Sequence, residues 1–283
     1  MLGLGLALSA SLGWGIADFI GGLQARRLPL LYVMLLSQGI ALTVLIVVVA
    51  AAGHGPPRIE RLWPAAAGGL AGIAGLTAFY RALAIGTMSI VAPIAATGVC
   101  LPVIVGIADG ERPAALQLVG IASAIAGVVL VSREPDRDDA GRRVARASVL
   151  LAVLAAIGFG ALAVGLRSSA RADVLWALVA ARGAGWVAIA TAFLAWGVPR
   201  RHDVAFRSQL PVLAALGTLD LGAEGLYALA TRHGLLSVVA VAASLYPLAT
   251  VILARSLLGE RVRRIQELGI VAAVAGIALI AAG

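Results

Sequence analysis

The chain has 283 residues, of which 61% are hydrophobic and 13% are charged, and its formal net charge is +8 at pH 7. A soluble domain carries about 25% charged residues, so this composition excludes an ordinary soluble protein and indicates an integral membrane protein. All 22 basic residues are Arg, and they occur mainly in short gaps between apolar runs. That distribution is typical of membrane-protein loops, and it argues against a nucleic-acid partner despite the positive charge.

Ten apolar runs predict ten helices, and each run is long enough to cross a bilayer, which takes about 20 residues. Rich in Ala, Leu, Val and Gly, the runs lack the alternation of period two that marks barrel strands. No basic segment precedes the first run, so we expect a retained span rather than a cleaved signal peptide. The predicted helices are 2–23, 30–52, 64–85, 88–108, 115–132, 147–166, 175–198, 209–231, 235–254 and 265–282.

A polar segment at 133–146 separates two halves that resemble each other, which we define as the first repeat (1–132) and the second repeat (147–283). GIASAIAGVVLV at 120–131 aligns with GIVAAVAGIALI at 269–280. Further pairs follow in the same order along the two halves: Gln38 with Arg182, Gly39 with Gly183, Tyr80 with Tyr227, Glu111 with Glu260 and Gln117 with Gln266.

Each repeat holds five predicted helices, and because five is odd the second repeat should enter the membrane in the opposite sense to the first. The sequence therefore predicts an all-α membrane protein of ten transmembrane helices in two inverted-topology repeats. This architecture is typical of secondary transporters that bind substrate near the bilayer midplane. Fourteen of the 22 Arg residues lie in loops on the side of segment 133–146. That bias predicts a cytoplasmic 133–146 loop and termini outside.

Charged residues inside a span are costly and often functional. Asp220 and Glu224 lie four residues apart in the eighth predicted helix, so they share a face that Tyr227 and Thr231 continue. Two acids this close in a low dielectric should not both ionise easily, which suits groups that load and release a proton. The alternative is a structural ion pair, in which Arg182 or Arg81 neutralises the acids.

Several other residues are candidates for a substrate or ion site. Arg182 and its repeat equivalent Gln38 place polar groups at corresponding depths, which favours a central cavity, and a guanidinium there could hold a carboxylate or phosphate in a bidentate contact. Arg81, beside Tyr80, either contributes at the cavity mouth or extends to the membrane surface. Asp18 either lines the cavity or anchors a helix end.

Three Pro residues interrupt the fourth and ninth predicted helices, and such breaks either line transporter sites or serve packing. Aromatic and hydroxyl groups near them are candidate lining residues, with an interfacial aromatic belt as the alternative. We also expect Glu111 and Glu260 to cap the helices that follow them. The Pro residues are Pro93, Pro102 and Pro247, and the candidate lining residues are Trp14, Ser244 and Tyr246.

Three doubled motifs carry a family resemblance. They are LGWGIADF (12–19) with IGFG (157–160), FYRALAIGTMSIVAPI (79–94) with LYALATRHGLLSVVAV (226–241), and DGERP (109–113) with LGERV (259–263). Over essentially the whole chain, these resemble the EamA-like transporters of the drug/metabolite transporter (DMT) superfamily. The resemblance implies an inner-membrane carrier of small metabolites, often amino acids and frequently exported, with the fifth and tenth helices at the periphery.

The sequence departs from that family's pattern in two places. Gly98 stands in the first repeat where the second has Pro247, and Asp18 stands where a neutral polar residue is common. The acid at this position raises ion coupling as a hypothesis.

No enzyme, cofactor or metal site is expected. The three His residues lie far apart, and neither a G-x-S-x-G motif nor a Walker loop occurs. The leading hypothesis is a monomeric secondary-active exporter of a small metabolite that works by alternating access, and coupling to protons through Asp220, Glu224 or Asp18 is a secondary prediction. An uncoupled facilitator is equally compatible with the sequence, and a membrane-embedded enzyme or a channel is a rival.

Overall fold

The computed structural model describes residues 2–53, 55–108, 114–131, 139–170, 172–197, 206–233, 242–243 and 245–282. Over these ranges the ordered elements are helices, and no strand occurs among them, which confirms the all-α prediction for this part of the chain. The elements are α1 (Leu2–Arg27), α2 (Leu30–Ala52), η1 (Ile59–Arg61), α3 (Trp63–Ile85), α4 (Met88–Ala96), η2 (Thr97–Val99), α5 (Cys100–Ala108), α6 (Ala115–Val131), α7 (Asp139–Ala170), α8 (Val174–Trp196), α9 (Phe206–His233), α11 (Tyr246–Leu258) and α12 (Arg264–Ala282).

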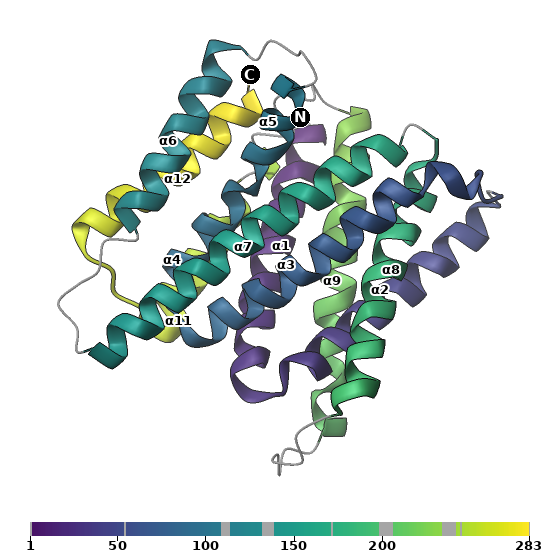
Figure 1. Ribbon diagram of the computed structural model, residues 1–283, viewed down its shortest axis with the longest axis horizontal. Coiled ribbons are helices and arrows are strands. Elements are labelled where there is room, and N and C mark those ends of the chain that lie inside the picture. Colours follow the sequence, from purple (N-terminus) through teal and green to yellow (C-terminus); the bar gives the residue numbers. More distant parts are fainter. Residues whose placement is uncertain are drawn as a thin grey trace.

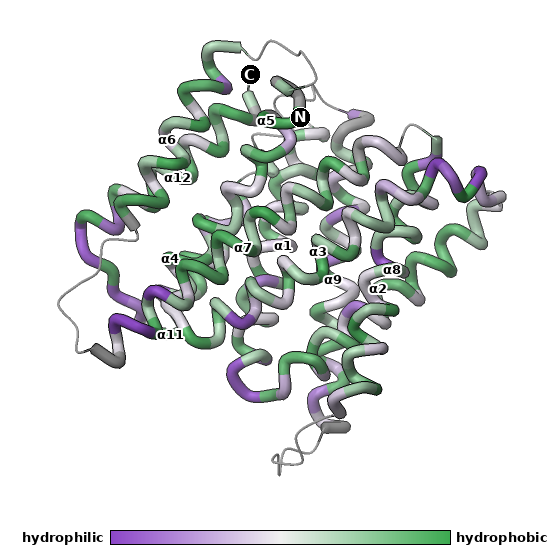
Figure 2. The backbone as a smooth tube through the Cα atoms, viewed as in Figure 1, coloured by the Kyte–Doolittle hydropathy of each residue, from purple (hydrophilic) through white to green (hydrophobic). Residues whose placement is uncertain are grey.

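The helices form a bundle whose outer surface is apolar along its middle. Five described helices, namely α1, α2, α3, α7 and α8, are long and apolar enough to cross a membrane. Figure 2 shows hydrophobic residues along the length of the helices and hydrophilic ones mostly at their ends. Large apolar side chains such as Val47 and Val187 are more than half exposed on the bundle's outside. Lipid chains can cover these apolar side chains, whereas their exposure to water would be unfavourable.

Helix α7 begins at Asp139, earlier than the predicted start at 147. Residues 139–146, expected as part of the polar loop, are therefore helical. The sequence there, DAGRRVAR, is rich in Ala and Arg, which are strong helix formers, and Asp139 lies at the positive end of the helix dipole. Hydropathy alone placed the helix boundary too late because these first turns are polar.

The predicted helix 88–108 is broken into α4, η2 and α5. Pro102 has no N–H to donate to the carbonyl of Gly98, four residues earlier, so the regular helical bonding is interrupted there. That carbonyl lies against Gly160 of α7, where the missing side chain permits the close approach. Pro93 lies inside α4 without ending it. Pro247 lies in the first turn of α11, a position at which proline is well tolerated.

Equivalent helices of the two repeats make equivalent contacts. Helix α1 packs along α9, and α7, which is the repeat equivalent of α1, packs along α3, the repeat equivalent of α9. Helices α6 and α12 pack on each other at one edge of the bundle (Figure 1), the peripheral position that the family resemblance implied for them. At their crossing Gly120 approaches Gly276, and Gly127 approaches Gly269. Each repeat therefore packs its first helix against the third helix of the other repeat.

Most of the described apolar core lies toward one end of the bundle. Phe79, Leu83, Met88 and Met34 are each at most 1% exposed and belong to one large cluster at the end where α3 meets α4. Toward the opposite end the described cluster around Ala7 and Ala230 is small. Among the described residues, the bundle is therefore more closely packed at the α3–α4 end than at the opposite end.

Candidate functional site

Arg182 of α8 lies at the centre of a cluster of charged and polar side chains. Its Nη2 donates to Asp220 Oδ2 at 2.9 Å and to Glu224 Oε1 at 2.6 Å, both on α9. Its Nη1 donates to Gln38 Oε1 on α2 at 3.1 Å. The Arg182 side chain is 11% exposed, against 24% and 28% for the two acids. The spacing of four residues on α9 places both carboxylates on one face, where one guanidinium nitrogen reaches both.

The contacts between Arg182 and the two acids offset part of the free-energy cost of burying these charges. A guanidinium and two carboxylates out of water are each expensive, and their mutual contacts offset that cost only while every partner is present. Of the two Arg residues considered for the acids, the structure brings Arg182 to them, while Arg81 of α3 is exposed. The two acids thus form an ion cluster with Arg182.

The cluster lies where the two repeats meet. Arg182 of the second repeat bonds to Gln38 of the first repeat, the residue that the alignment of the repeats pairs with it. One turn along α8, Trp186 Nε1 donates to the carbonyl of Leu35 at 3.1 Å. Gly39 makes room for this indole, because a Cβ at Gly39 would lie 2.7 Å from Nε1. Helices α2 and α8 are thereby fixed against each other beside the charges.

A third acid, Asp18 of α1, lies one helical turn from a group of packed aromatic rings. Trp14 lies one turn before Asp18, and its ring centroid is 5.8 Å from that of Tyr227 and 6.4 Å from that of Tyr246. Asp18 interacts electrostatically with Asp220 and with Tyr246. Its carboxylate has no hydrogen-bond or ion-pair partner within the described ranges, although the residue is only partly exposed. Asp18 therefore lies near the charged residues around Arg182 but has no neutralising partner of its own. We call Asp18, Arg182, Asp220 and Glu224 the central cluster.

The other predicted residues lie at varied distances from this cluster. Tyr80 is 2% exposed, packs against Phe79 at 6.1 Å between ring centroids, and contacts Gly21 of α1. Its hydroxyl is within electrostatic range of Asp18, Asp220 and Arg182. Ser244 lies outside the described residues. Pro93 and Pro247 are buried and Pro102 is partly exposed, and no polar contact ties them to Arg182 in the described structure.

A second polar cluster, which the sequence did not indicate, lies at the α3–α4 end. Glu260 accepts hydrogen bonds from the N–H groups of Met88 and Ser89 and from the Ser89 hydroxyl, each at 2.9 Å. Arg26, at the end of α1, lies 3.7 Å from Glu260 and donates to the carbonyls of Leu83 and Gly86. We call this set the inter-repeat latch, because Glu260 belongs to the second repeat and its partners to the first.

The expectation that Glu260 caps the helix after it is wrong. Glu260 caps α4 of the other repeat, and in the first turn of α12 it is Gln266 whose Oε1 accepts from the Arg263 N–H at 3.1 Å. Gln117 does the same for α6 by accepting from the Ala114 N–H at 3.1 Å. The matched Gln pair in the aligned repeats was the available signal for these caps. Glu111 lies outside the described residues.

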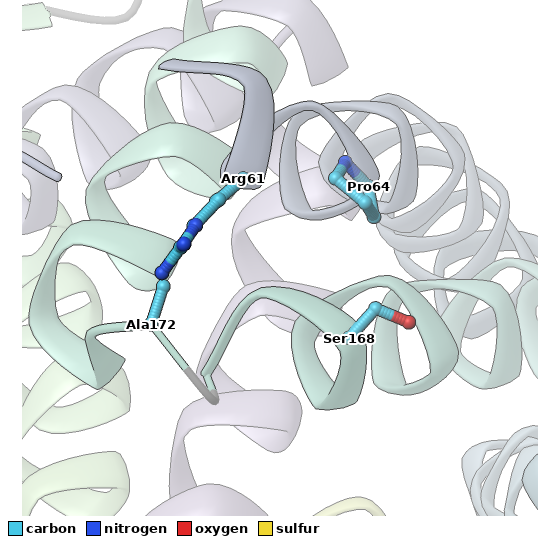
Figure 3. Close-up of a pocket in the computed structure, with 4 residues that line it drawn as sticks. All are labelled: Arg61, Pro64, Ser168 and Ala172. Carbon is cyan, nitrogen blue, oxygen red and sulfur yellow. The ribbon is translucent and has the colours of Figure 1, made fainter. Parts of the chain in front are cut away.

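A shallow surface pocket lies away from both clusters. Figure 3 shows its lining, which comprises Arg61 of η1, Pro64 of α3, Ser168 of α7 and Ala172 just after α7. Its volume is about 310 Å³ and it is open to the outside. None of the residues expected to bind substrate lines this pocket. The buried charges at Arg182 are therefore the stronger candidate for a functional site.

Comparisons with known proteins bear on the family and the fold. A comparison with curated proteins finds no match. One solved structure, titled only as a crystal structure of a protein, is similar with a TM-score of 0.63 at 17% identity, over 97% of this chain and 95% of the other. At that identity the likeness concerns the fold alone. The model of the EamA-like transporter family matches residues 1–133 and again 146–282, one match to each repeat. The chain therefore belongs to the EamA-like transporter family and is a multi-pass membrane transporter.

Proposed function

We propose that this transporter is a secondary-active exporter of small metabolites such as amino acids, coupled to protons through Asp220 and Glu224. The observation that carries the proposal is the cluster in which one guanidinium serves two carboxylates at the meeting of the repeats. A proton that binds one acid weakens that acid's contact with Arg182 and leaves the other to neutralise it. Protonation can thus change the packing of α8 against α9, which is what a coupled cycle requires.

The cycle we propose is alternating access between two inverted repeats. The exchange of contacts between α1–α9 and α7–α3 supports a two-fold relation between the repeats, and five helices in each support opposite insertion. With the Arg-rich loops in the cytoplasm, the α3–α4 end faces the cytoplasm and the termini lie outside. The protein would act as a monomer in a bacterial inner membrane.

In this cycle the inter-repeat latch closes the cytoplasmic end. Its residues lie beside the large apolar cluster, and Glu260 joins the second repeat to the start of α4 in the first. Opening toward the cytoplasm would separate Glu260 from the Met88 and Ser89 amides and from Arg26. The conformation described here then has its cytoplasmic end shut.

Transport by purified protein in liposomes tests the proposal. A growth screen of an overexpressing strain against toxic amino acids and their analogues selects the solute. Its flux is then measured with and without an imposed pH gradient. We expect the gradient to drive accumulation by the wild type, and Asp220→Asn and Glu224→Gln to lose that dependence. Glu267→Gln, which removes an acid in an exposed pair with Arg255, is the matched control.

Three other outcomes would replace the proposal. Flux that ignores the gradient in the wild type would identify an uncoupled facilitator. Voltage-driven single-channel currents would identify a channel. Chemical conversion of the solute would identify a membrane-embedded enzyme.

A further inference from the structure

The central cluster has more negative than positive charge. The described side chains there are three carboxylates, at Asp18, Asp220 and Glu224, and one guanidinium, at Arg182. With all four ionised the cluster carries two uncompensated negative charges inside the bundle. Arg81 does not reduce this excess because it is exposed on α3. Such an excess in a membrane interior favours the entry of a positive group.

Arg182 is poorly placed to receive an anion. Its Nη2 already serves both acids and its Nη1 serves Gln38. Only its buried Nε has no partner among the described groups, so one nitrogen remains, which is too few for a bidentate contact. An anionic substrate would have to displace two carboxylates that sit at 2.9 and 2.6 Å. The bidentate capture of a carboxylate or phosphate that the sequence suggested is therefore disfavoured.

The cluster also has hydrogen-bond acceptors to spare. Glu224 Oε2 is buried, and no described group donates to it. Asp18 likewise accepts no hydrogen bond within the described ranges. A buried carboxylate oxygen without a donor is unfavourable, and a ligand that donates N–H groups would satisfy it.

Trp14 lies one helical turn from the unpartnered acid and packs against two further aromatic rings. Trp14, Tyr227 and Tyr246 come from α1, α9 and α11, and the two centroid distances from Trp14 are 5.8 and 6.4 Å. Trp14 precedes Asp18 by one helical turn, and Tyr246 interacts electrostatically with Asp18. Aromatic faces next to a carboxylate form the environment that attracts an ammonium group. A metal ion fits less well, because within the described residues no three Asp, Glu, His or Cys side chains, those of this cluster included, are placed so that they could hold one metal ion.

From this geometry we infer that the transported substrate is a small organic cation. Its ammonium group binds between Asp18 and the rings of Trp14, Tyr227 and Tyr246, and its N–H groups or positive surface reach Glu224. The inference rests on the proposed function, in that the central cluster is taken as the substrate site. It narrows that proposal from small metabolites in general to amines and quaternary ammonium compounds.

Binding to the purified chain in detergent tests the charge class directly. The probes are three solutes of similar shape: choline as the cation, 3,3-dimethyl-1-butanol as the neutral isostere and 3,3-dimethylbutyrate as the anion. Thermal unfolding is followed against solute concentration. We expect choline to raise the unfolding temperature and the other two to have no saturable effect. Asp18→Asn should weaken choline binding at least tenfold, and Trp14→Leu about fivefold, the size of an interaction between a cation and an aromatic face.

Matched variants separate the site from general effects. Trp196→Leu changes a Trp that is 79% exposed, and choline should bind it as it binds the wild type. The inference is overturned if the neutral solute or the anion binds as tightly as choline, if none of the three binds, or if Asp18→Asn binds choline unchanged. Flux of bound choline into liposomes is a separate readout. Choline that binds but does not cross would contradict the transport proposal while leaving the cation site in place.

Discussion

Helices α3 and α9 occupy equivalent places in the two repeats, yet they differ in what they carry. Tyr80 of α3 matches Tyr227 of α9, and each helix packs along the first helix of the other repeat. Where α9 has Asp220 and Glu224, α3 has Ile73 and Thr77. The fold thus forms with or without acids on this face. The acids are an addition to one copy, which favours a functional role over an architectural one.

The two helices also differ at a glycine that they share. Gly75 of α3 is buried, and a Cβ placed on it would lie 3.0 Å from the Gly158 Cα of α7. Its equivalent on α9, Gly222, is exposed, and a Cβ there would meet no atom within 4 Å among the described groups. Close helix packing therefore depends on α3 more than on α9 at this level. At the level of this glycine, the acids therefore lie on the less closely packed of the two helices.

The largest expected effect comes from removing the cation that serves the α9 acids. Arg182→Met leaves two acids without a cationic partner, and we expect a loss of about 3–5 kcal/mol in the free energy of unfolding. Adding Asp220→Asn and Glu224→Gln should restore most of that loss. Unfolding in mixed micelles measures both. An unchanged free energy in the single variant would mean that the ion cluster does not hold α8 to α9.

A smaller difference is expected between the paired glycines. Gly75→Ala should reduce the free energy of unfolding by about 1–3 kcal/mol, because the added methyl group presses on backbone atoms of α7. Gly222→Ala should leave it unchanged or raise it by up to about 1 kcal/mol, since Ala favours a helix over Gly. The same micelle titration compares them. Equal losses would show that α9 is packed as tightly as α3.

The smallest effect is expected at Thr77, the α3 equivalent of Glu224. Its hydroxyl donates to the Ile73 carbonyl of its own helix at 2.7 Å. Thr77→Val should therefore change the free energy of unfolding by less than about 0.5 kcal/mol and leave the transport rate unchanged. The transport rate of Thr77→Val in liposomes is measured alongside that of Glu224→Gln. A lost flux in Thr77→Val would place the α3 face in the substrate path.

Local patterns anticipated the ten-helix organisation and part of the site. The four-residue spacing of Asp220 and Glu224 follows from helix periodicity, and aligning the repeats paired Gln38 with Arg182, which the structure brings into contact. The latch could not be anticipated in this way. We expected Glu260 to cap the helix that follows it in sequence. Instead, Glu260 accepts from the first amide of a helix that begins 172 residues earlier along the chain. Only the packing of the repeats brings these groups together, and hydropathy carries no information about that.

The Glu260 contact also constrains the order in which the protein can be completed during synthesis. Helix α4 emerges from the ribosome early, yet the carboxylate that satisfies its first amides is made 171 to 172 residues later. Until then the amides of Met88 and Ser89 lack this acceptor, and Arg26 lacks its carboxylate. The first repeat therefore enters the membrane before the start of α4 is capped. The cap forms only when the segment that carries Glu260, between the last two helices, has been made.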